Sequence, residues 1–505
     1  MNRRDYLKLK FGALAFTSLP AVSSFALDQY SWKAQFHRAL KDKPWLLGYK
    51  GAESLSYESK AKKISGELPD ELRGTHYRNG PARHEIGDFR YHHWFDGDGM
   101  LNAFQFSDAG VSHKARMIQT QKHKAELAAN RALYPGFATI PPDPKPVTSP
   151  DSINSANISV LAHHNKLLAL WEAGSAHEIN PETLETVGTY AFTEDTAGAP
   201  FSAHPRIEPD GTLWNFGYME AANLLIIWHI DVKGKLVKAE PIKVDPITMI
   251  HDFVVTAKHL VFLVPPLHFN KEARTNFLDS HEWHASDPTR VLVVDKNDFS
   301  NQSIHELPAQ WVYHFGNAWE DEAGVIRFDA ARSPNAEFIF TTFRDVMRGI
   351  TPNAGESHHY TYRIDTKNGK ISESQIVPDN IGGDFPSIDP RVSTHRYKQV
   401  FLLTANNKRP APHGWLTSVS RLNVESGNMD TYEYPINQIP EEHLFVPKAG
   451  SATEGEGWVI GTSLDYLEAK TIMSVFNAQN LNAGPIAEYQ LPYALPLGLH
   501  GKFVR

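Results

Sequence analysis

Four histidines occupy similar places in a chain of 505 residues. Three of them open β-like segments, in "AHPRI", "MIHDF" and "YHFGN", and the fourth lies near the end of the chain in "GLHGKF". They are His204, His251, His314 and His500. Since the chain has 0 cysteines, a bound metal ion must be held by imidazole and carboxylate groups. Four neutral imidazoles suit a divalent ion such as Fe(II), Cu(II) or Zn(II), and ligand type alone does not choose among them.

Carboxylates at comparable places in the chain supply partners for these imidazoles. A metal-bound imidazole usually donates its second ring N–H to a carboxylate, which fixes the tautomer. The candidates are Glu172 in "LWEAG", Asp384 in "GGDFPSID" and Glu454 in "ATEGEGW". Each one taken singly is also typical of an ordinary surface carboxylate.

A turn signal recurs between β-like runs and indicates how these residues are positioned. Its spacing is roughly 60 residues, which in a β-rich chain is typical of a β-propeller. Asn and Asp suit such turns because their short side chains bond the nearby backbone. The six turns are centred on Asn180, Asp231, Asp295, Asp365, Asn423 and Asn477.

An inner hairpin precedes each of these outer hairpins. In a propeller the innermost strands face the central channel, so the residues that open them converge near the axis on one face. Six units, with a seventh blade assembled from both chain ends, predict an all-β, seven-bladed propeller. The segment "RALYPGF" and the Pro-rich "TIPPDPKPVTSP" predict a small helical and loop cap over the axial site.

The N-terminal segment resembles a twin-arginine export signal. Arg3 and Arg4 precede an apolar run that is too short to span a membrane and contains Pro20. We therefore expect residues 1–27 to be an export signal read by the twin-arginine machinery, residues 28–505 to form a single propeller domain, and the protein to be periplasmic. An ordinary amphipathic start with a chance arginine pair is the alternative.

Composition excludes some classes of partner. A net charge of -8 leaves no basic surface typical of nucleic-acid binding. The glycine-rich "FDGDGM" lacks the Lys and Ser/Thr of a phosphate-binding loop, so a tight turn is the better interpretation. The apolar "ALYPGF" and "ATIPP" fit either a mouth that rests peripherally on a membrane or a loop packed on the propeller.

Several motifs in fixed order resemble the carotenoid cleavage oxygenase family. They are "GTHYRNGP", "HWFDGDGM", "AHPRI", "MIHDF", "HFGNAWE", "DFPSID" and "GLHGKF", and the resemblance runs from about Ser65 to the C-terminus. It implies one non-haem Fe(II) per chain on the propeller axis. It also implies that O2 is a co-substrate and that a conjugated C=C bond is cleaved into two carbonyl (aldehyde) products.

The resemblance also implies roles for individual residues. His204, His251, His314 and His500 match the iron ligands of the family. Glu172, Asp384 and Glu454 match its outer-shell acids and are expected to serve His251, His314 and His500 in that order. Asp384 stands where glutamate is usual, so we expect a closer backbone, a bridging water or a more loosely held imidazole.

The resemblance leaves the substrate open. "YALPLGLHGKF" and "MIHDF" favour a carotenoid or apocarotenoid, while a hydroxystilbene is the alternative. Lys122 lies near the position of a phenol-binding lysine in stilbene cleavers, with Phe89 or Tyr91 facing the same tunnel, but a solvated surface lysine fits the sequence as well. A propeller that binds an apolar ligand without cleaving it is a further hypothesis.

Overall fold

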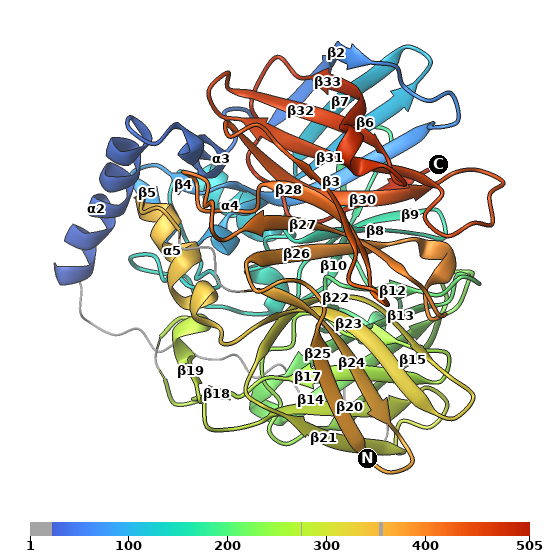
Figure 1. Cartoon of the computed structure of the whole chain (residues 1–505). Helices are drawn as coiled ribbons and strands as arrows, with labels where there is room; N and C mark the ends of the chain where they lie inside the picture. Colours follow the sequence, from blue (N-terminus) through green and yellow to red (C-terminus); the bar gives the residue numbers. More distant parts are fainter. Residues whose placement is uncertain (1–22, 274, 353–356) are drawn as a thin grey trace.

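Seven β-sheets of four or five strands stand around a common axis in the part of the chain that the structure describes (Figure 1). The structure is a computed structural model and describes residues 23–273, 275–352 and 357–505. Paired strands within each sheet run antiparallel, as in β8 against β9 and β13 against β14. The predicted all-β, seven-bladed propeller is therefore confirmed.

Five of the blades each use one continuous stretch of chain. Two of them are β8 (Ser159–His163), β9 (Lys166–Leu170), β10 (Ala176–Ile179) and β11 (Thr186–Tyr190), and β12 (Arg206–Ile207), β13 (Leu213–Met219), β14 (Leu224–Ile230) and β15 (Leu236–Lys243). The other three are β16 (Val254–Val255), β17 (His259–Val264), β20 (Thr289–Asp295) and β21 (Gln302–Leu307), then β22 (Trp311–Glu320), β23 (Val325–Ser333), β24 (His358–Asp365) and β25 (Lys370–Gln375), then β26 (Ile381–Ile388), β27 (Gln399–Asn406), β28 (Ser418–Asn423) and β29 (Met429–Glu433).

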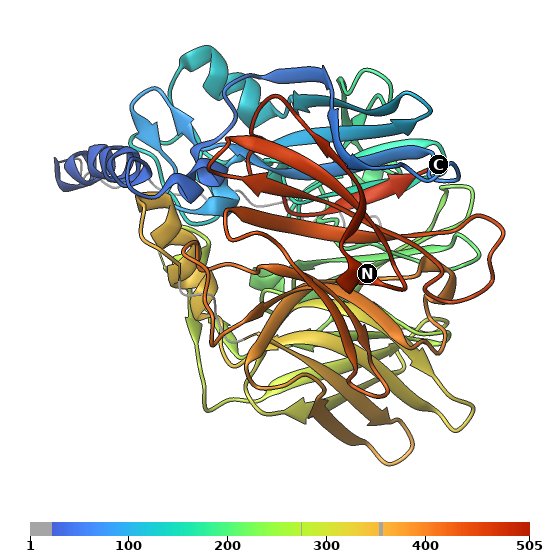
Figure 2. The same ribbon diagram turned by 45° about the horizontal axis from the view of Figure 1, so that its top comes forward.

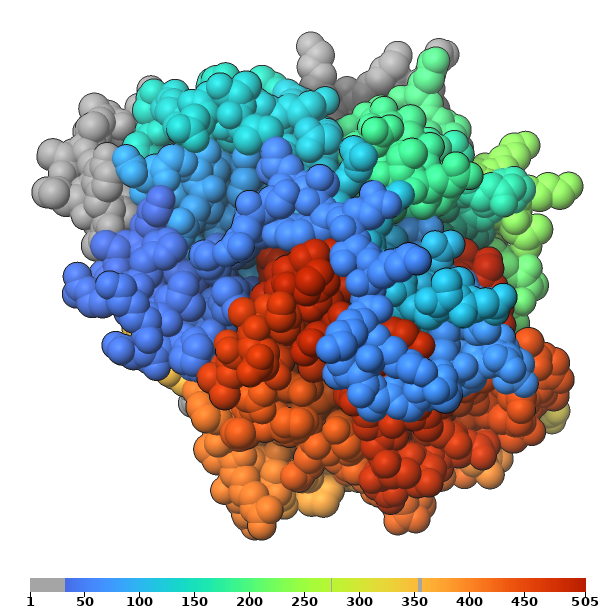
Figure 3. Space-filling model, turned by 90° about the horizontal axis from the view of Figure 1, so that it is seen from above, coloured from blue at the N-terminus to red at the C-terminus, as the bar shows by residue number. Residues whose placement is uncertain are grey.

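The other two blades combine strands from both chain ends, where the sequence predicted one such blade. The first contains β1 (Ser56–Lys60), β3 (Gly74–Arg83), β6 (Asp98–Ser107), β7 (Gly110–Met117) and the late strand β34 (Gly501–Val504). The second contains β30 (Gln438–Pro447), β31 (Gly457–Asp465), β32 (Lys470–Asn477), β33 (Pro485–Gln490) and the early strand β2 (Lys62–Gly66). Early and late residues therefore lie side by side on the surface (Figure 3). Backbone hydrogen bonds close the ring at two adjacent blades.

The predicted turn residues lie in the outer hairpins. At the β14–β15 turn, the Asp231 carboxylate accepts hydrogen bonds from the N–H groups of Lys233 and Lys235, each at 2.9 Å. Gly234 in this turn takes a φ of 74°, which a residue with a Cβ rarely adopts. Asn180 performs the same function at the β10–β11 turn, where its side chain accepts hydrogen bonds from Glu182 and Thr183.

The hydrophobic core fills the wedges between neighbouring blades. Between the β12–β15 and β16–β21 blades, the ring of Phe253 stacks on Phe262 at 5.3 Å and meets the edge of Phe216 at 5.1 Å. Because both faces of these sheets are buried, β14 and β17 are almost continuously apolar. The packed wedges hold the inner strands in place around the axis.

The helices gather at one end of the propeller and form the predicted cap (Figures 1 and 2). They are α2 (Ser23–Leu40), α3 (Leu47–Lys50), α4 (Gln121–Ala129) and α5 (Phe343–Asp345). Two short hairpins, β4 (Glu85–Ile86) with β5 (Phe89–Arg90) and β18 (Leu267–Phe269) with β19 (His281–Trp283), add to the strands of the blades. Thr120 caps α4 by accepting from the His123 N–H, and Asn130 ends it in the left-handed conformation.

The predicted export signal falls mostly outside the described residues, which begin at residue 23. Helix α2 starts at Ser23 and continues across the predicted boundary after residue 27. None of the helices that the structure describes is long and apolar enough to cross a membrane. The division into a signal and a single domain therefore stays a prediction.

Candidate metal centre and its cavity

The four predicted histidines meet on the propeller axis. One ring nitrogen from each lies within 4.8 Å of the others. The Nε2 atoms of His204 and His251 are 2.9 Å apart, and the ring centroids of His314 and His500 are 4.7 Å apart. His204, His251 and His500 come just before the inner strands β12, β16 and β34, and His314 lies inside β22. Four different blades therefore contribute one imidazole each.

Carboxylates occupy the second ring nitrogen of three of these histidines. The Nδ1 atom of His251 is hydrogen bonded to Glu172. The Nδ1 atom of His314 lies 2.8 Å from the Asp384 Oδ1 atom. Both contacts join the residues that the sequence paired. With Nδ1 engaged in this way, the Nε2 nitrogens are the ones that face one another.

The carboxylate at His500 corrects the prediction. Glu442 Oε1 lies 2.7 Å from the Nδ1 atom of His500, and Glu442 Oε2 accepts from the Gly501 N–H. The predicted partner, Glu454, instead accepts hydrogen bonds from the backbone N–H groups of Lys398 and Gln399. Glu454 lies in the turn after β30, whereas Glu442 lies in the first half of that strand. The motif "PEEHLF" was a usable signal, because it opens the inner strand of the last blade as the histidine motifs open theirs.

β-Bulges on the inner strands aim three of these side chains. On β30, Pro440 pairs with Ser463 and His443 pairs with Gly461, so Glu441 and Glu442 together oppose one residue. On β22, the register shifts between Val312 and Phe315, where His314 lies. On β26, the shift follows Asp384. A bulge bends the strand and redirects a side chain that regular alternation would point elsewhere.

Asp384 contacts its histidine directly although it is one methylene shorter than glutamate. The residue after it, Phe385, has a φ of 58°, and its N–H donates to the same carboxylate oxygen at 2.7 Å. The bend in β26 therefore presents the short side chain to His314. Of the three possibilities left open by the sequence, a closer backbone is the one found.

The donor set fits a divalent metal ion. The Nε2 atom of His314 is buried and has no hydrogen-bond partner among the described residues. Burial and the three neighbouring imidazoles lower the pKa of His204 well below its ordinary value. Burial also lowers the pKa of His314, despite the nearby Asp384. Both shifts favour the neutral imidazole, which is the form that binds a metal ion.

The acid beside His314 is held in its charged form. Burial raises the pKa of the Asp384 carboxyl, but the adjacent His314 and the Phe385 N–H outweigh that effect, so its pKa is below the ordinary value. An ionised carboxylate fixes the proton of His314 on Nδ1 and leaves the lone pair of Nε2 free.

A largely apolar cavity of about 1500 Å³, its open mouth included, lies against this centre. His251, His314 and His500 form part of its wall, and Phe95, Phe137, Met249, Phe338 and Leu403 contribute apolar surface. The ring of Tyr313 meets the His251 ring edge to face at 4.5 Å. The cavity joins the metal centre to the underside of the cap.

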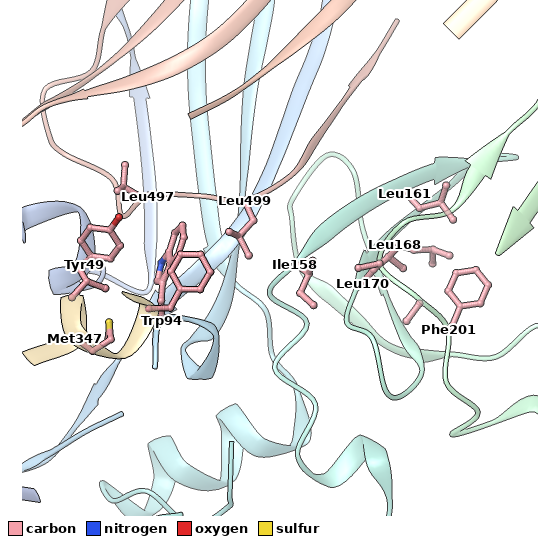
Figure 4. Packing of buried hydrophobic residues seen from close by; sticks show 14 of the residues in the cluster. Tyr49, Trp94, Ile158, Leu161, Leu168, Leu170, Phe201, Met347, Leu497 and Leu499 are labelled. Carbon is pink, nitrogen blue, oxygen red and sulfur yellow. The ribbon is translucent and has the colours of Figure 1, made fainter. Parts of the chain in front are cut away.

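Four aromatic rings form a box in the wall of the cavity. We call Tyr49, Trp94, Phe343 and Trp415 the aromatic box, since their ring centroids lie between 5.3 and 6.2 Å apart in contacting pairs. Figure 4 shows Tyr49 and Trp94 beside Leu497 and Leu499 from the segment before His500. The box therefore combines Tyr49 of α3 and Phe343 of α5 with Trp94, from the turn before β6, and Trp415, from the loop between β27 and β28.

Lys122 belongs to neither of the two environments considered from the sequence. Its side chain is 1% exposed, and its ammonium group lies 2.9 Å from both Asp98 and Glu126. It also lies 4.5 Å from the centre of the Tyr91 ring. Neither Lys122 nor Tyr91 nor Phe89 lines the cavity. The interpretations as a solvated lysine and as a tunnel residue are both wrong, because Asp98 and Glu126 pair with it beneath α4.

A seven-bladed propeller with four axial histidines, three of them backed by carboxylates, defines a class of metal-dependent oxygenases. The family described as retinal pigment epithelial membrane protein, RPE65, matches residues 52–505. The chain belongs to this family, the RPE65 or carotenoid cleavage oxygenase family, as the motifs predicted.

Relatives in the family match nearly the whole chain. The apocarotenoid-15,15'-oxygenase of Synechocystis is 27% identical over 93% of this chain and 97% of its own length. Lignostilbene-alpha,beta-dioxygenase isozyme III of Sphingomonas paucimobilis is 27% identical over 87% and 92%, and the isoeugenol monooxygenase of Pseudomonas putida is 26% identical over 87% and 93%. The crystal structure of cobalt-substituted Synechocystis ACO superimposes with a TM-score of 0.83 at 25% identity, over 92% of this chain and 98% of that one. The predicted class of enzyme, an oxygenase of the carotenoid cleavage dioxygenase type, is confirmed.

Proposed function

We propose that this protein is a non-haem Fe(II) oxygenase that uses O2 to cleave a conjugated C=C bond of a carotenoid or apocarotenoid into aldehydes. The observation that carries the proposal is the four-histidine centre opening onto a largely apolar cavity. One Fe(II) per chain is expected at the Nε2 atoms of His204, His251, His314 and His500.

The residues around the centre hold and orient rather than transfer protons. Bound iron would supply the activation of O2 that the protein's own groups cannot provide. Glu172, Asp384 and Glu442 fix three imidazoles and offset part of the positive charge of the ion. The aromatic wall excludes water and orients an extended apolar substrate, so that one double bond lies beside the centre.

The charged groups that line the cavity favour an uncharged substrate. Glu441 is hydrogen bonded to Arg78 and to the Gly498 N–H, and the other acids are engaged by the histidines. Among the described residues that line the cavity there is no Lys or Arg. A phenolate or a carboxylate would therefore meet no cationic side chain there, which is costly in an apolar site. A neutral polyene avoids this cost.

A hydroxystilbene is the second candidate, and the aromatic box supports it. Four rings around one part of the cavity suit edge and stacking contacts with a phenyl ring. The lignostilbene and isoeugenol enzymes among the relatives belong to the same family. A neutral phenol, rather than a phenolate, is the form that this site would accept.

The test is product analysis with iron-loaded protein. Neutral carotenoids, apocarotenals and hydroxystilbenes are incubated separately under O2 and under argon, and aldehydes are identified by mass spectrometry. We expect oxygen-dependent aldehydes from a polyene. Aldehydes from stilbenes alone would favour the second candidate. Tight binding of a polyene, by fluorescence quenching, with no product under O2 would mean that the propeller only binds its ligand.

We also propose that residues 1–27 direct export to the periplasm. The support is the sequence alone: Arg3 and Arg4 ahead of a short apolar run. Peripheral contact between the cap and a membrane is a further proposal that rests on the sequence alone, because Ala132, Leu133 and Tyr134 of "ALYPGF" are buried, as in a loop packed on the propeller. Cosedimentation of the purified protein with liposomes tests it, and recovery of all the protein in the supernatant would contradict it.

A further inference from the structure

A second group of metal-binding side chains lies on the β18–β19 hairpin, apart from the four axial histidines. It contains His268 on β18, His284 just after β19, and Asp287. One donor atom from each of the three lies within 4.8 Å of the others. All three side chains reach solvent, with exposed fractions of 49%, 35% and 42%.

The donor atoms are spaced as ligands of one small cation are. Asp287 Oδ2 lies 2.8 Å from His268 Nε2 and 3.9 Å from His284 Nδ1. Four ligands about 2.0–2.2 Å from a tetrahedral ion lie about 3.4 Å from one another. The two distances bracket this value. Glu282 lies on the other side of the ring, with an oxygen 3.6 Å from His284 Nε2, where it can accept the second ring N–H.

The backbone beneath these side chains is fixed. Leu267 pairs with Trp283 across the hairpin, and the His284 N–H donates to the Pro266 carbonyl at 2.9 Å. The Asp287 N–H donates to the His284 carbonyl at 3.1 Å. A preformed backbone lowers the entropic cost of gathering the ligands.

The two imidazoles must splay apart to share an ion. Their rings lie parallel, with centroids 3.7 Å apart and planes 6° apart. A metal ion lies in the plane of each imidazole that binds it, so the two rings have to splay. Both rings are partly exposed, and side chains of this kind change rotamer at a small cost in free energy. In the structure the two rings stack on each other and both lie near the Asp287 carboxylate, so the three donors are already close together.

We propose that His268, His284 and Asp287 bind a borderline divalent cation such as Zn2+, with water as the fourth ligand. Two imidazoles and a carboxylate are typical Zn2+ donors, and the absence of thiolate excludes a soft-metal site. The ion ties β18 to the segment after β19. Leu267 and Trp283 of this hairpin pack in one cluster with Tyr313 and Phe338 of the cavity wall. The site therefore braces that wall from outside and does not depend on the reaction at the axis.

The experiment compares Zn2+ binding by the full chain and by the double variant His268→Ala/His284→Ala, using isothermal titration and metal analysis after dialysis. We expect the variant to bind one Zn2+ fewer per chain and to show a smaller rise in Tm with Zn2+ than the wild type does. His395→Ala, which removes an exposed histidine on another blade, is the matched control and should bind as the wild type does. Equal Zn2+ stoichiometry in wild type and double variant would overturn the proposal.

A gentler variant guards against misfolding. Asp287→Asn keeps the shape of the side chain but removes its charge, so we expect Zn2+ affinity to fall at least 10-fold while the Tm without metal is unchanged. Wild-type affinity in Asp287→Asn, with the double variant unfolded, would also overturn the proposal. Ions bound at the axial histidines are present in all these proteins and cancel in the comparison.

Discussion

Two buried polar clusters differ in how far the protein itself matches their charges and lone pairs. The Lys122 ammonium group donates hydrogen bonds to Asp98 and Glu126. The Nδ1 atom of His123 is hydrogen bonded to the Asp98 Oδ2 atom at 3.0 Å. At the axis, three imidazoles have a carboxylate on one nitrogen, but the Nε2 atom of buried His314 has no partner among the described residues. The Nε2 atom of His123 is likewise buried without a partner among the described residues, but the charges of the first cluster are matched within the protein. At the axis the unpartnered nitrogen is one of four converging imidazole donors, which is the arrangement that fits a metal ion.

The pKa values follow the same division. Burial opposes the charge on Lys122, but Asp98, Tyr91 and Glu126 outweigh it and raise its pKa well above the ordinary value. His204 has only like groups around it, so burial and its neighbours lower its pKa together. A buried group whose charge is matched within the protein stabilises the fold, whereas a set of convergent lone pairs indicates an external partner.

The largest expected effect is at the axis. His251→Ala removes one ligand and leaves the Glu172 carboxylate without its hydrogen bond to His251. We therefore expect turnover to be abolished and iron occupancy to fall well below one per chain. Metal analysis and the aldehyde assay measure both. Full iron content and activity in this variant would refute the four-histidine centre.

Lys122→Met tests the compensated cluster. It leaves Asp98 and Glu126 buried with one cation fewer, and losing one member of a buried pair typically costs about 3–5 kcal/mol. We expect a clear fall in the free energy of unfolding by denaturant titration. The fraction of Lys122→Met that is folded should still bind one iron per chain. A loss of iron without a loss of stability would mean that Lys122 serves the site.

Asp384→Asn keeps a side chain of the same length, with an oxygen that can accept the hydrogen bond from His314, but removes the negative charge beside His314. Changes of this kind cost about 10- to 100-fold in metal affinity or activity. Asp384→Glu restores a longer acid where β26 has already bent inward, so we expect a smaller loss. Iron affinity and kcat are the measurements, and wild-type values in the Asn variant would contradict the role of the acid.

Glu442→Gln and Glu454→Gln distinguish the observed partner of His500 from the predicted one. Because only Glu442 contacts His500, we expect its variant to lose about 10-fold in iron affinity. Glu454→Gln should leave iron affinity unchanged and alter only local stability, since its carboxylate serves two backbone N–H groups. The reverse pattern would favour the sequence-based assignment.

Replacing Arg3 and Arg4 by Lys should change the location of the protein and not its catalysis. We expect the variant to stay in the cytoplasm, with unchanged kcat and iron content after purification. Cell fractionation measures the first, and periplasmic delivery of the variant would show that the arginine pair is coincidental.

Much of the fold followed from local patterns. The outer turns were predictable because Asp231 and Asn180 bond their own backbone, which is a property of a few adjacent residues. The four histidines were found because they begin equivalent inner strands. These inferences need only the register of a repeat, which a sequence displays directly.

The errors share a physical cause, which is that tertiary contacts override local pattern. Glu442 points to the axis because a bulge breaks the alternation of β30, and a bulge leaves no clear mark in a sequence. Lys122 is buried because Asp98, 24 residues earlier, neutralises it. The second mixed blade was missed because β2 is exposed and polar, and only its pairing with β33 defines it.

The pairing of β34 with β3 makes ring closure and the completion of the metal centre a single event. Thr75 to Arg78 align with Gly501 to Val504, directly after His500. A chain whose last strand has not docked presents three imidazoles and an open sheet edge. If the centre binds a metal ion as proposed, tight retention of the ion would report that β34 has docked on β3.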